Sequence, residues 1–272
     1  MDKRLYVAAI QMNAGPDKDR NIRSAARLVT RAALRWARFI LLPETFNFRG
    51  KWEKGADIAE DIPGPSTQPL IGIAASRDVW ILAGSVYERA PGSKRSYNSS
   101  ALIGPDGKIK AVYRKLHLFD VSLGNKKMSE SRSCLKGKEP VLASVSGIRT
   151  GFSICYDLRF PELYRRYSGM GARILCVPSS FTRATGMAHW EVLLRARAIE
   201  NQSFVIAPNQ FGIGLGGAPT YGRSMIIDPW GGILASASLD REEIIYADLD
   251  LVRLERMRME FPALRHRRID YA

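Results

Sequence analysis

A cysteine lies where a predicted strand meets a predicted helix in residues 151–162, which read Gly-Phe-Ser-Ile-Cys-Tyr-Asp-Leu-Arg-Phe-Pro-Glu. The apolar run Ile148–Ile154 is typical of a buried strand, and Pro161 favours the first turn of a helix. Backbone N–H groups and the helix dipole at such a junction favour a thiolate, so Cys155 is a candidate nucleophile. A lone cysteine is more often a small buried hydrophobic residue, and this segment alone leaves both interpretations open.

Two further reactive side chains end apolar stretches. Glu44 ends Phe-Ile-Leu-Leu-Pro-Glu, and Lys115 ends Ile-Lys-Ala-Val-Tyr-Arg-Lys. Because strand ends from different segments converge at one edge in α/β folds, we expect both to meet Cys155. The carboxylate would then act as a base, while the ammonium would hold an oxyanion and lower the pKa of the thiol. Taken singly, each charged residue could equally be a solvated strand end or half of a structural ion pair.

The elements that must position these residues alternate along the chain. The apolar periodicity predicts strands over residues 6–12, 39–42, 80–87, 141–145, 148–154, 173–177, 203–208 and 244–249. Helices are predicted over residues 19–39, 66–77, 160–170, 188–201 and 250–259. Two hairpins are predicted, over residues 97–115 and 222–238. Residues 116–137 lack periodicity and are expected to form a long functional loop. The halves repeat one order of elements, which predicts an α/β fold with one sheet per half packed face to face, in a single domain over 1–272.

Composition excludes several classes of protein. The chain has 272 residues, 46% of them hydrophobic, and no apolar window long enough for a membrane helix, and its start is expected to be a strand and not a signal peptide. Three cysteines at unrelated spacings argue against a disulfide framework and predict a reducing compartment, the cytoplasm. The net charge of +14 is spread along the chain without a nucleic-acid motif, so we expect a solvated or interface-forming surface and no nucleic-acid or membrane partner.

Two familiar site types can be set aside. Gly212-x-Gly214-x-x-Gly217 fits a dinucleotide-binding pattern, but no helix follows it to receive a pyrophosphate. The histidines and cysteines lack metal-ligand spacing, so no zinc site is expected.

The reactive segments resemble the three motifs of the nitrilase superfamily of carbon–nitrogen hydrolases. These are Leu-Leu-Pro-Glu44, Tyr-Arg-Lys115-Leu-His-Leu-Phe-Asp and Cys155-Tyr-Asp-Leu-Arg-Phe-Pro-Glu. Further stretches match in order, so that the resemblance covers nearly the whole chain: Pro178-Ser-Ser-Phe-Thr, Ala188-His-Trp-Glu-Val-Leu-Leu-Arg-Ala-Arg-Ala, Tyr221-Gly-Arg-Ser-Met-Ile-Ile-Asp-Pro-Trp-Gly and the final His266-Arg-Arg. The sequence after the cysteine is most similar to the ω-amidase and deaminated-glutathione amidase branch, whereas true nitrilases usually carry Cys-Trp-Glu.

This resemblance implies a four-layer α-β-β-α sandwich without a metal or organic cofactor. It also implies homodimers or larger homo-oligomers in which C-terminal arms, here about residues 250–272, are exchanged. Proteins of that branch have a second functional glutamate, which lies in a Glu-Ser pair. The matching pair here is Glu130-Ser131, so Glu130 is expected to orient Lys115 and the substrate amide. The tyrosine that binds substrate in ω-amidases has no counterpart after Glu44.

The mechanism implied is hydrolysis of a small amide through a thioester. Glu44 would take the proton of Cys155, and Lys115 with the backbone N–H of Tyr156 would hold the oxyanion. Small carboxylate-bearing amides would suit a basic pocket. The expected substrate-binding residues are Phe46, Asn47, Arg49, Arg159, Phe181 and Arg183.

Two alternatives remain from the sequence. One is a nitrilase or an N-carbamoyl amino acid hydrolase of the same superfamily. The other is a catalytically silent scaffold or binding protein, against which the intact Glu44, Lys115 and Cys155 argue.

Overall fold

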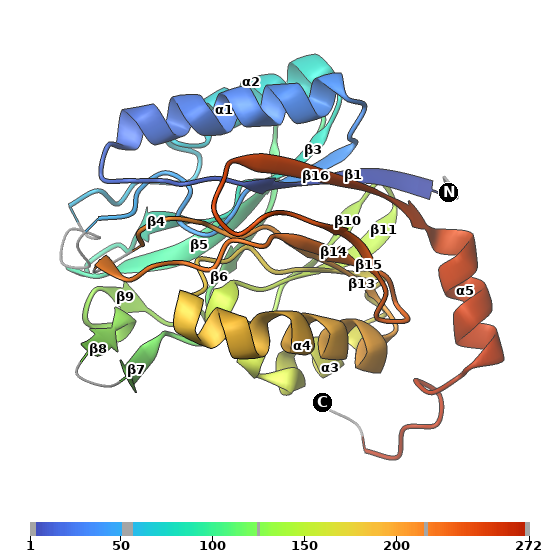
Figure 1. Ribbon diagram of the computed structural model, residues 1–272. Coiled ribbons are helices and arrows are strands. Elements are labelled where there is room, and N and C mark those ends of the chain that lie inside the picture. The colour runs from blue at the N-terminus through green and yellow to red at the C-terminus, as the bar shows by residue number, and fades with distance from the viewer. Residues whose placement is uncertain (1–3, 51–56, 124–125, 215–216, 270–272) are drawn as a thin grey trace.

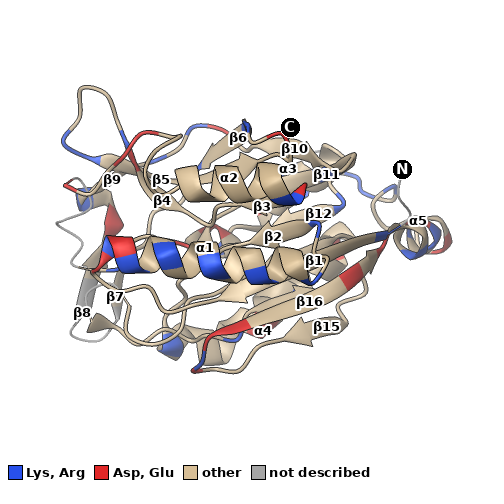
Figure 2. Cartoon of the chain, turned by 90° about the horizontal axis from the view of Figure 1, so that it is seen from above, with Lys and Arg blue, Asp and Glu red and all other residues tan. Residues whose placement is uncertain are grey.

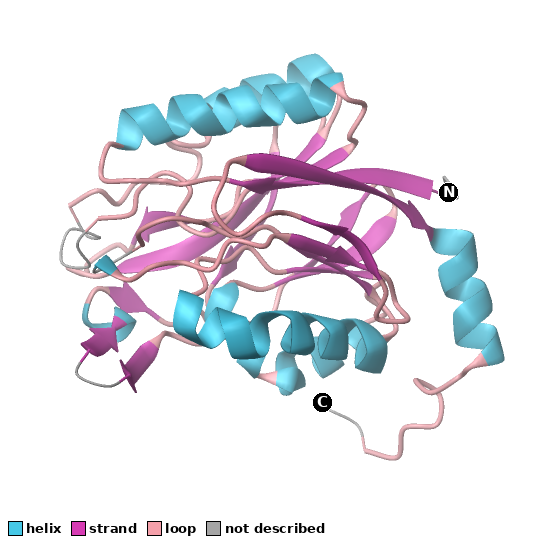
Figure 3. Cartoon of the chain, in the orientation of Figure 1, coloured by secondary structure: helices cyan, strands magenta, loops and turns pink. Residues whose placement is uncertain are grey.

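Two β-sheets lie face to face between two layers of helices (Figure 1; Figure 3). The computed structural model describes residues 4–50, 57–123, 126–214 and 217–269. Helices α1 (Lys18–Leu34) and α2 (Gln68–Arg77) cover one outer face, and α3 (Pro161–Gly169) and α4 (Arg183–Asn201) cover the other. The expected four-layer α-β-β-α sandwich is confirmed. In the described residues, none of the helices combines the length and the hydrophobicity needed to span a bilayer.

The first sheet is built mainly from the N-terminal half. Its strands run in the order β16 (Glu243–Asp250), β1 (Arg4–Gln11), β2 (Phe39–Leu41), β3 (Trp80–Leu82), β5 (Ser96–Ile103) and β4 (Val86–Arg89), with β6 (Ile109–Arg114) and β9 (Cys134–Leu135) also pairing with β5. Strands β1, β2 and β3 are parallel. Parallel strands buried on both faces account for the continuous apolar runs in this part of the sequence.

The second sheet is built from the C-terminal half. Its order is β10 (Leu142–Val145), β11 (Ile148–Phe152), β12 (Ile174–Cys176), β13 (Phe204–Ala207), β14 (Met225–Ile227) and β15 (Ile233–Ser236). Helix α5 (Leu251–Glu260) follows β16 and lies at the side of the sandwich (Figure 1).

Side-chain alternation in the strands divides the hydrophobic core. In β1, Val7 and Ala9 face the second sheet, whereas Ala8 and Ile10 face α1. Successive strand residues point to opposite faces, so one strand contributes to both contacts. The core between the sheets reaches through to Trp190 of α4, and all of these side chains are fully buried.

The structure corrects four sequence expectations. Residues 80–87 form two strands, because Gly84 adopts a φ of +40° and turns the chain between them. The described part of residues 116–137 is not a loop without secondary structure, because it contains a hairpin of β7 (Asp120–Leu123) and β8 (Lys126–Ser129). Helix α4 begins five residues before the expected start at 188. The division into one sheet per half also fails for β16, which pairs antiparallel with β1 over eight residue pairs.

Basic residues are prominent on the outer surface of α1 (Figure 2). Arg20, Arg23, Arg27 and Arg31 are exposed there, and Arg27 forms an ion pair with Glu242 at 2.8 Å. Part of the positive net charge of the chain therefore lies on the solvent-exposed face of α1.

Candidate active site

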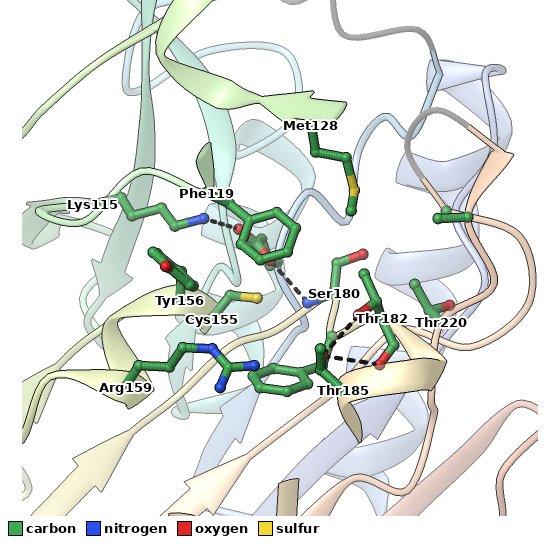
Figure 4. Close-up of a pocket in the computed structure, with 14 residues that line it drawn as sticks. Lys115, Phe119, Met128, Cys155, Tyr156, Arg159, Ser180, Thr182, Thr185 and Thr220 are labelled. Carbon is green, nitrogen blue, oxygen red and sulfur yellow. Dashed lines mark hydrogen bonds and ion pairs between the residues drawn. The ribbon is translucent and has the colours of Figure 1, made fainter. Parts of the chain in front are cut away.

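The four side chains predicted to be catalytic converge at one end of the sandwich. The Nζ of Lys115 lies 2.8 Å from Oε1 of Glu44 and 2.9 Å from Oε2 of Glu130. Cys155 lies beside them at the base of a pocket (Figure 4). All four residues are buried, with exposed fractions of 1% to 8%. The expected convergence of separate strand ends therefore occurs, and it brings Glu130 in from the β7–β8 region.

The segment after β2 fixes the Glu44 carboxylate. Thr45 has a φ of +49°, and its N–H donates to Oγ of Ser85 at 2.9 Å, so the chain turns sharply directly after Glu44. The side chain of Gln210 donates to the carbonyl oxygen of Glu44 at 3.0 Å. The backbone N–H of Ser180 donates to Oε2 of the carboxylate at 2.8 Å. Elements of both sheets therefore hold this glutamate.

The turn after β11 presents Cys155 in an uncommon conformation. Its φ is +48°, in the left-handed region that side chains other than glycine rarely occupy. Its backbone N–H donates to the carbonyl oxygen of Pro178 at 2.9 Å, and a short 3₁₀ helix, Cys155–Arg159, begins there. Within the described part of the chain, the next N–H, of Tyr156, has no acceptor. Of the N–H groups of Cys155 and Tyr156, that of Tyr156 is therefore the one available to donate a hydrogen bond to a bound substrate.

The pKa of the Cys155 thiol is raised, although the sequence predicts that Lys115 would lower it. Burial raises the pKa of Cys155 well above its ordinary value, and the neighbouring Glu44 carboxylate raises it further. Lys115 acts in the expected direction, but its charge does not offset these two effects. Burial lowers the pKa of Lys115, but Glu130 and Glu44 outweigh burial and raise that pKa well above its usual value. A protonated thiol therefore lies next to a carboxylate, with a charged ammonium alongside.

Glu130 lies in a 3₁₀ helix, Glu130–Arg132, that follows β8. Its carboxylate accepts from Lys115 and, at 2.8 Å, from the backbone N–H of Phe119. The side chain of Asn98 on β5 also donates to Glu130, at 3.0 Å. Asn98 was not predicted from the sequence, because a single asparagine inside a strand pattern gives no signal of a role.

A pocket of about 530 Å³, including its open mouth, extends from the cysteine. Of the expected substrate-binding residues, Arg159 and Phe181 line it, and the guanidinium carbon of Arg159 lies 5.1 Å from the centre of the Phe181 ring. The sequence did not predict the rest of the wall, which is apolar on one side and carries hydroxyl groups on the other (Figure 4): Phe119, Met128, Ser180, Thr182, Thr185, Gly214, Ala218 and Thr220.

The other four expected binding residues do not line the pocket. Phe46 and Asn47 are fully buried, and the side chain of Asn47 donates to Oγ of Ser66. Arg183, the first residue of α4, is exposed at the surface.

Arg49 is buried and occupied by contacts within the protein. It donates to Oε1 of Gln210 at 2.9 Å and to Oγ1 of Thr220 at 3.2 Å. Burial lowers its pKa to about 10. Arg49 therefore supports the wall of the pocket from behind and does not contact its space.

A metal site does not emerge from the described residues, where no three His, Cys, Asp or Glu side chains are grouped as ligands.

Comparisons with known proteins cover almost the whole chain. The family described as carbon-nitrogen hydrolase matches residues 6–259. A deaminated glutathione amidase of Synechocystis sp. is 41% identical over 270 residues, which cover 97% of this chain and 98% of that protein. The omega-amidase NIT2 of Homo sapiens is 36% identical over 97% of this chain and 95% of its own length. The crystal structure of Saccharomyces cerevisiae Nit3, a member of branch 10 of the nitrilase superfamily, has a TM-score of 0.87 and 32% identity, covering 98% and 97% of the two chains.

Proposed function

The chain belongs to the carbon–nitrogen hydrolase family, and from this premise we propose that it is an amidase whose nucleophile is Cys155. Its relatives confirm the branch that the motifs indicated, and they support a hydrolase acting on carbon–nitrogen bonds other than peptide bonds. The observation that carries the proposed site is the contact of Lys115 with both Glu44 and Glu130 beside a buried thiol.

The first half-reaction forms a thioester. The Glu44 carboxylate takes the proton of the Cys155 thiol as sulfur attacks the amide carbon and the carbonyl oxygen becomes an oxyanion. Lys115 and the N–H of Tyr156 stabilise this oxyanion, and one such donor contributes about 3 kcal/mol to lowering the barrier. The carbon–nitrogen bond then breaks, Glu44 returns its proton to the nitrogen, and ammonia leaves. The raised pKa of the thiol supports a role for Glu44 as base at the moment of attack.

The second half-reaction hydrolyses the thioester. Glu44 takes a proton from water, and the oxygen attacks the thioester carbon in the same oxyanion site. The carbon–sulfur bond breaks, the proton returns to sulfur, and a carboxylic acid is released. Glu130 keeps Lys115 charged and in place throughout, which its contacts at 2.9 and 3.2 Å support.

The proposed substrates are small amides that carry a carboxylate. Three of the expected substrate-binding residues are arginines, Arg49, Arg159 and Arg183, and among the described residues only Arg159 lines the pocket. A guanidinium can bind a carboxylate with two parallel hydrogen bonds. The names of the relatives, a deaminated glutathione amidase and an omega-amidase, support this substrate class.

The remaining proposals concern the whole chain. We place it as a single domain in a homodimer or larger homo-oligomer, without nucleic-acid or membrane partners. Exposed apolar side chains of the β14–β15 turn and of the segment after α5 support a contact between copies, since Trp230 and Phe261 are 63% and 56% exposed and pack edge to face. The three free cysteines support a cytoplasmic location.

An ammonia-release screen tests the function. The wild-type protein and Cys155→Ala are assayed on amides with and without a carboxylate, on nitriles and on N-carbamoyl amino acids. Cys176→Ala, a change at a cysteine in the core, is the matched control. We expect release from carboxylate-bearing amides by the wild type and the control, and none by Cys155→Ala. Unchanged release by Cys155→Ala would contradict the mechanism, and a preference for nitriles or carbamoyl compounds would contradict the substrate class.

A further inference from the structure

Asn98 contacts all three charged residues of the site. Its Nδ2 donates to Oε1 of Glu44 and to Oε1 of Glu130, each at 3.0 Å. Its main-chain oxygen accepts from the backbone N–H of Lys115 at 2.9 Å. The residue lies in β5 and is 2% exposed. One side-chain amide therefore bridges two buried carboxylates that share a single ammonium group.

The charges of the site explain why an amide is needed there. The Glu44 and Glu130 side chains share the single ammonium group of Lys115 in a buried place, and a further cation there would alter the balance of charge. An asparagine offers two N–H donors without a charge, so it can satisfy one oxygen of each glutamate. Such hydrogen bonds to ionised groups are stronger than those between neutral groups.

The orientation of the amide is fixed by the same contacts. Turned by 180°, its Oδ1 would face two carboxylate oxygens, so the carboxylates select the donor side. In the described structure Oδ1 has no hydrogen-bond partner. An unpartnered buried oxygen is costly, which indicates that the contacts of Nδ2 outweigh that loss.

The bonds also distinguish the two oxygens of Glu44. Oε1 accepts from both Asn98 and Lys115, whereas Oε2 accepts one bond, from the N–H of Ser180. The oxygen with fewer donors has more capacity for a proton. Oε2 is therefore the oxygen suited to exchange a proton with the thiol and the leaving nitrogen.

We propose that Asn98 is a positioning residue for the amidase reaction, holding Glu44 and Glu130 on either side of Lys115 and leaving Oε2 of Glu44 as the proton-exchanging oxygen. This inference rests on the proposed function. The pH dependence of the activity reflects all the titratable groups near the amide and not one of them alone. These groups come from several elements and are Glu44, Tyr87, Lys115, Glu130, Cys134 and Cys155.

Two substitutions of similar size test this role in opposite directions. Asn98→Leu removes both donors, so the ionised carboxylates lose support and activity falls most at low pH. Asn98→Asp adds a carboxyl group that can donate only when protonated, so its activity falls most at high pH. We expect kcat to drop about 10- to 100-fold in each, since bonds to charged groups are lost, with a KM changed less than about threefold.

The control is Ser100→Ala, two residues along β5. Ser100 is also buried, and its hydroxyl has no hydrogen-bond partner in the described structure, so its removal should leave kcat and the pH profile unchanged. Steady-state rates of ammonia release are measured from about pH 5.5 to about pH 9, together with the thermal unfolding of each variant.

Opposite displacements of the two pH profiles would support the proposal, because a purely structural defect lowers activity by one factor at every pH. Wild-type kcat in Asn98→Leu, equal losses at every pH, or unfolding of both variants would overturn it. None of these results would alter the test of the amidase function, which depends on Cys155→Ala.

Discussion

The Nδ1 atom of His117 lies 2.7 Å from Oδ1 of Asp157 and so ties the segment after Lys115 to the turn that carries Cys155. The same carboxylate accepts from the hydroxyl of Tyr113 at 2.6 Å and from the backbone N–H of Ile154 at 2.8 Å. Asp157 is fully buried. This network sets the separation of the ammonium and the thiol without contacting the pocket.

Asp157→Asn tests that link. An amide has one acceptor oxygen where the carboxylate has two, so some of the buried donors lose their partner. We expect the free energy of unfolding to fall by about 3 kcal/mol and kcat to fall with it. Urea unfolding and ammonia release measure the two effects. Asp106→Asn, at a solvent-exposed carboxylate, should change neither, and an unaltered Asp157→Asn protein would show that the network is dispensable.

The raised pKa of Cys155 predicts how its alkylation depends on pH. A thiol held neutral by burial and by Glu44 gains thiolate only slowly as the pH rises. Labelling of Cys155 by iodoacetamide should therefore keep accelerating from about pH 7 to about pH 9, as measured by peptide mass spectrometry. A rate that levels off below about pH 8 would instead show a thiolate formed before the substrate binds, which would contradict the role of Glu44 as base.

Removing the ammonium should destabilise the fold in a pH-dependent way. Lys115→Met leaves Glu44 and Glu130 buried without a cation, which costs about 3–5 kcal/mol at neutral pH. The pKa of Lys115 is raised, so its contribution in the wild type is complete below the ordinary lysine pKa and disappears only as the pH rises through the folded-state value.

Wild-type stability should therefore show no loss from this group between about pH 6 and about pH 9, whereas the variant should become more stable as the pH falls and its carboxylates protonate. Denaturant unfolding at several pH values measures both curves. Lys110→Met, in a more exposed ion pair with Asp106, is the control. Equal slopes for Lys115→Met and the control would contradict the buried ion-pair arrangement.

Arg159→Met should affect the KM for carboxylate-bearing amides but not the KM for neutral amides. Loss of a guanidinium bond to a carboxylate should raise KM for carboxylate-bearing amides about 10- to 100-fold and leave that for neutral amides nearly unchanged. Arg183→Met removes an exposed arginine that does not line the pocket and should have no effect. A similar change for both substrate types would assign Arg159 to packing against Tyr156 and Phe181.

Gly84→Ala should displace Glu44 through the backbone. Gly84 has a φ of +40°, and a Cβ there would lie 2.0 Å from the carbonyl oxygen of Pro43. The residue before Glu44 must therefore move, and both stability and kcat should fall. In the control Gly72→Ala, in α2, the added Cβ has no other atom within 4 Å. This substitution should stabilise the protein by about 0.5–1 kcal/mol. Thermal unfolding and ammonia release give the comparison, and wild-type activity in Gly84→Ala would refute the coupling.

Much of the architecture could be predicted because it depends on local patterns. The buried strands of both sheets and the hairpins around Asp106-Gly107 and the Asp228-Pro-Trp turn lie where the apolar runs placed them. Glu44, Lys115 and Cys155 could be found because each lies just beyond a strand. Glu130 required the family resemblance, since its place depends on the β7–β8 region, whose sequence has no clear period.

The remaining features depend on contacts between distant segments. The sequence around Arg49 does not show that its guanidinium group donates hydrogen bonds to Gln210 and Thr220. The raised pKa of Cys155 follows mainly from its burial, which the positions of Lys115 and Glu44 in the sequence cannot reveal. Asn98 matters only because two carboxylates from other elements meet it.

The pairing of β1 with β16 has a consequence for synthesis on the ribosome. Arg4 bonds to Asp248, 244 residues further along the chain, so an edge of β1 has no strand partner until nearly all of the protein has emerged. Contacts of such long range form late and slow the folding of β proteins. A nascent chain that stalls before residue 243 therefore exposes an unpaired edge of β1, to which another chain could add a strand and start aggregation.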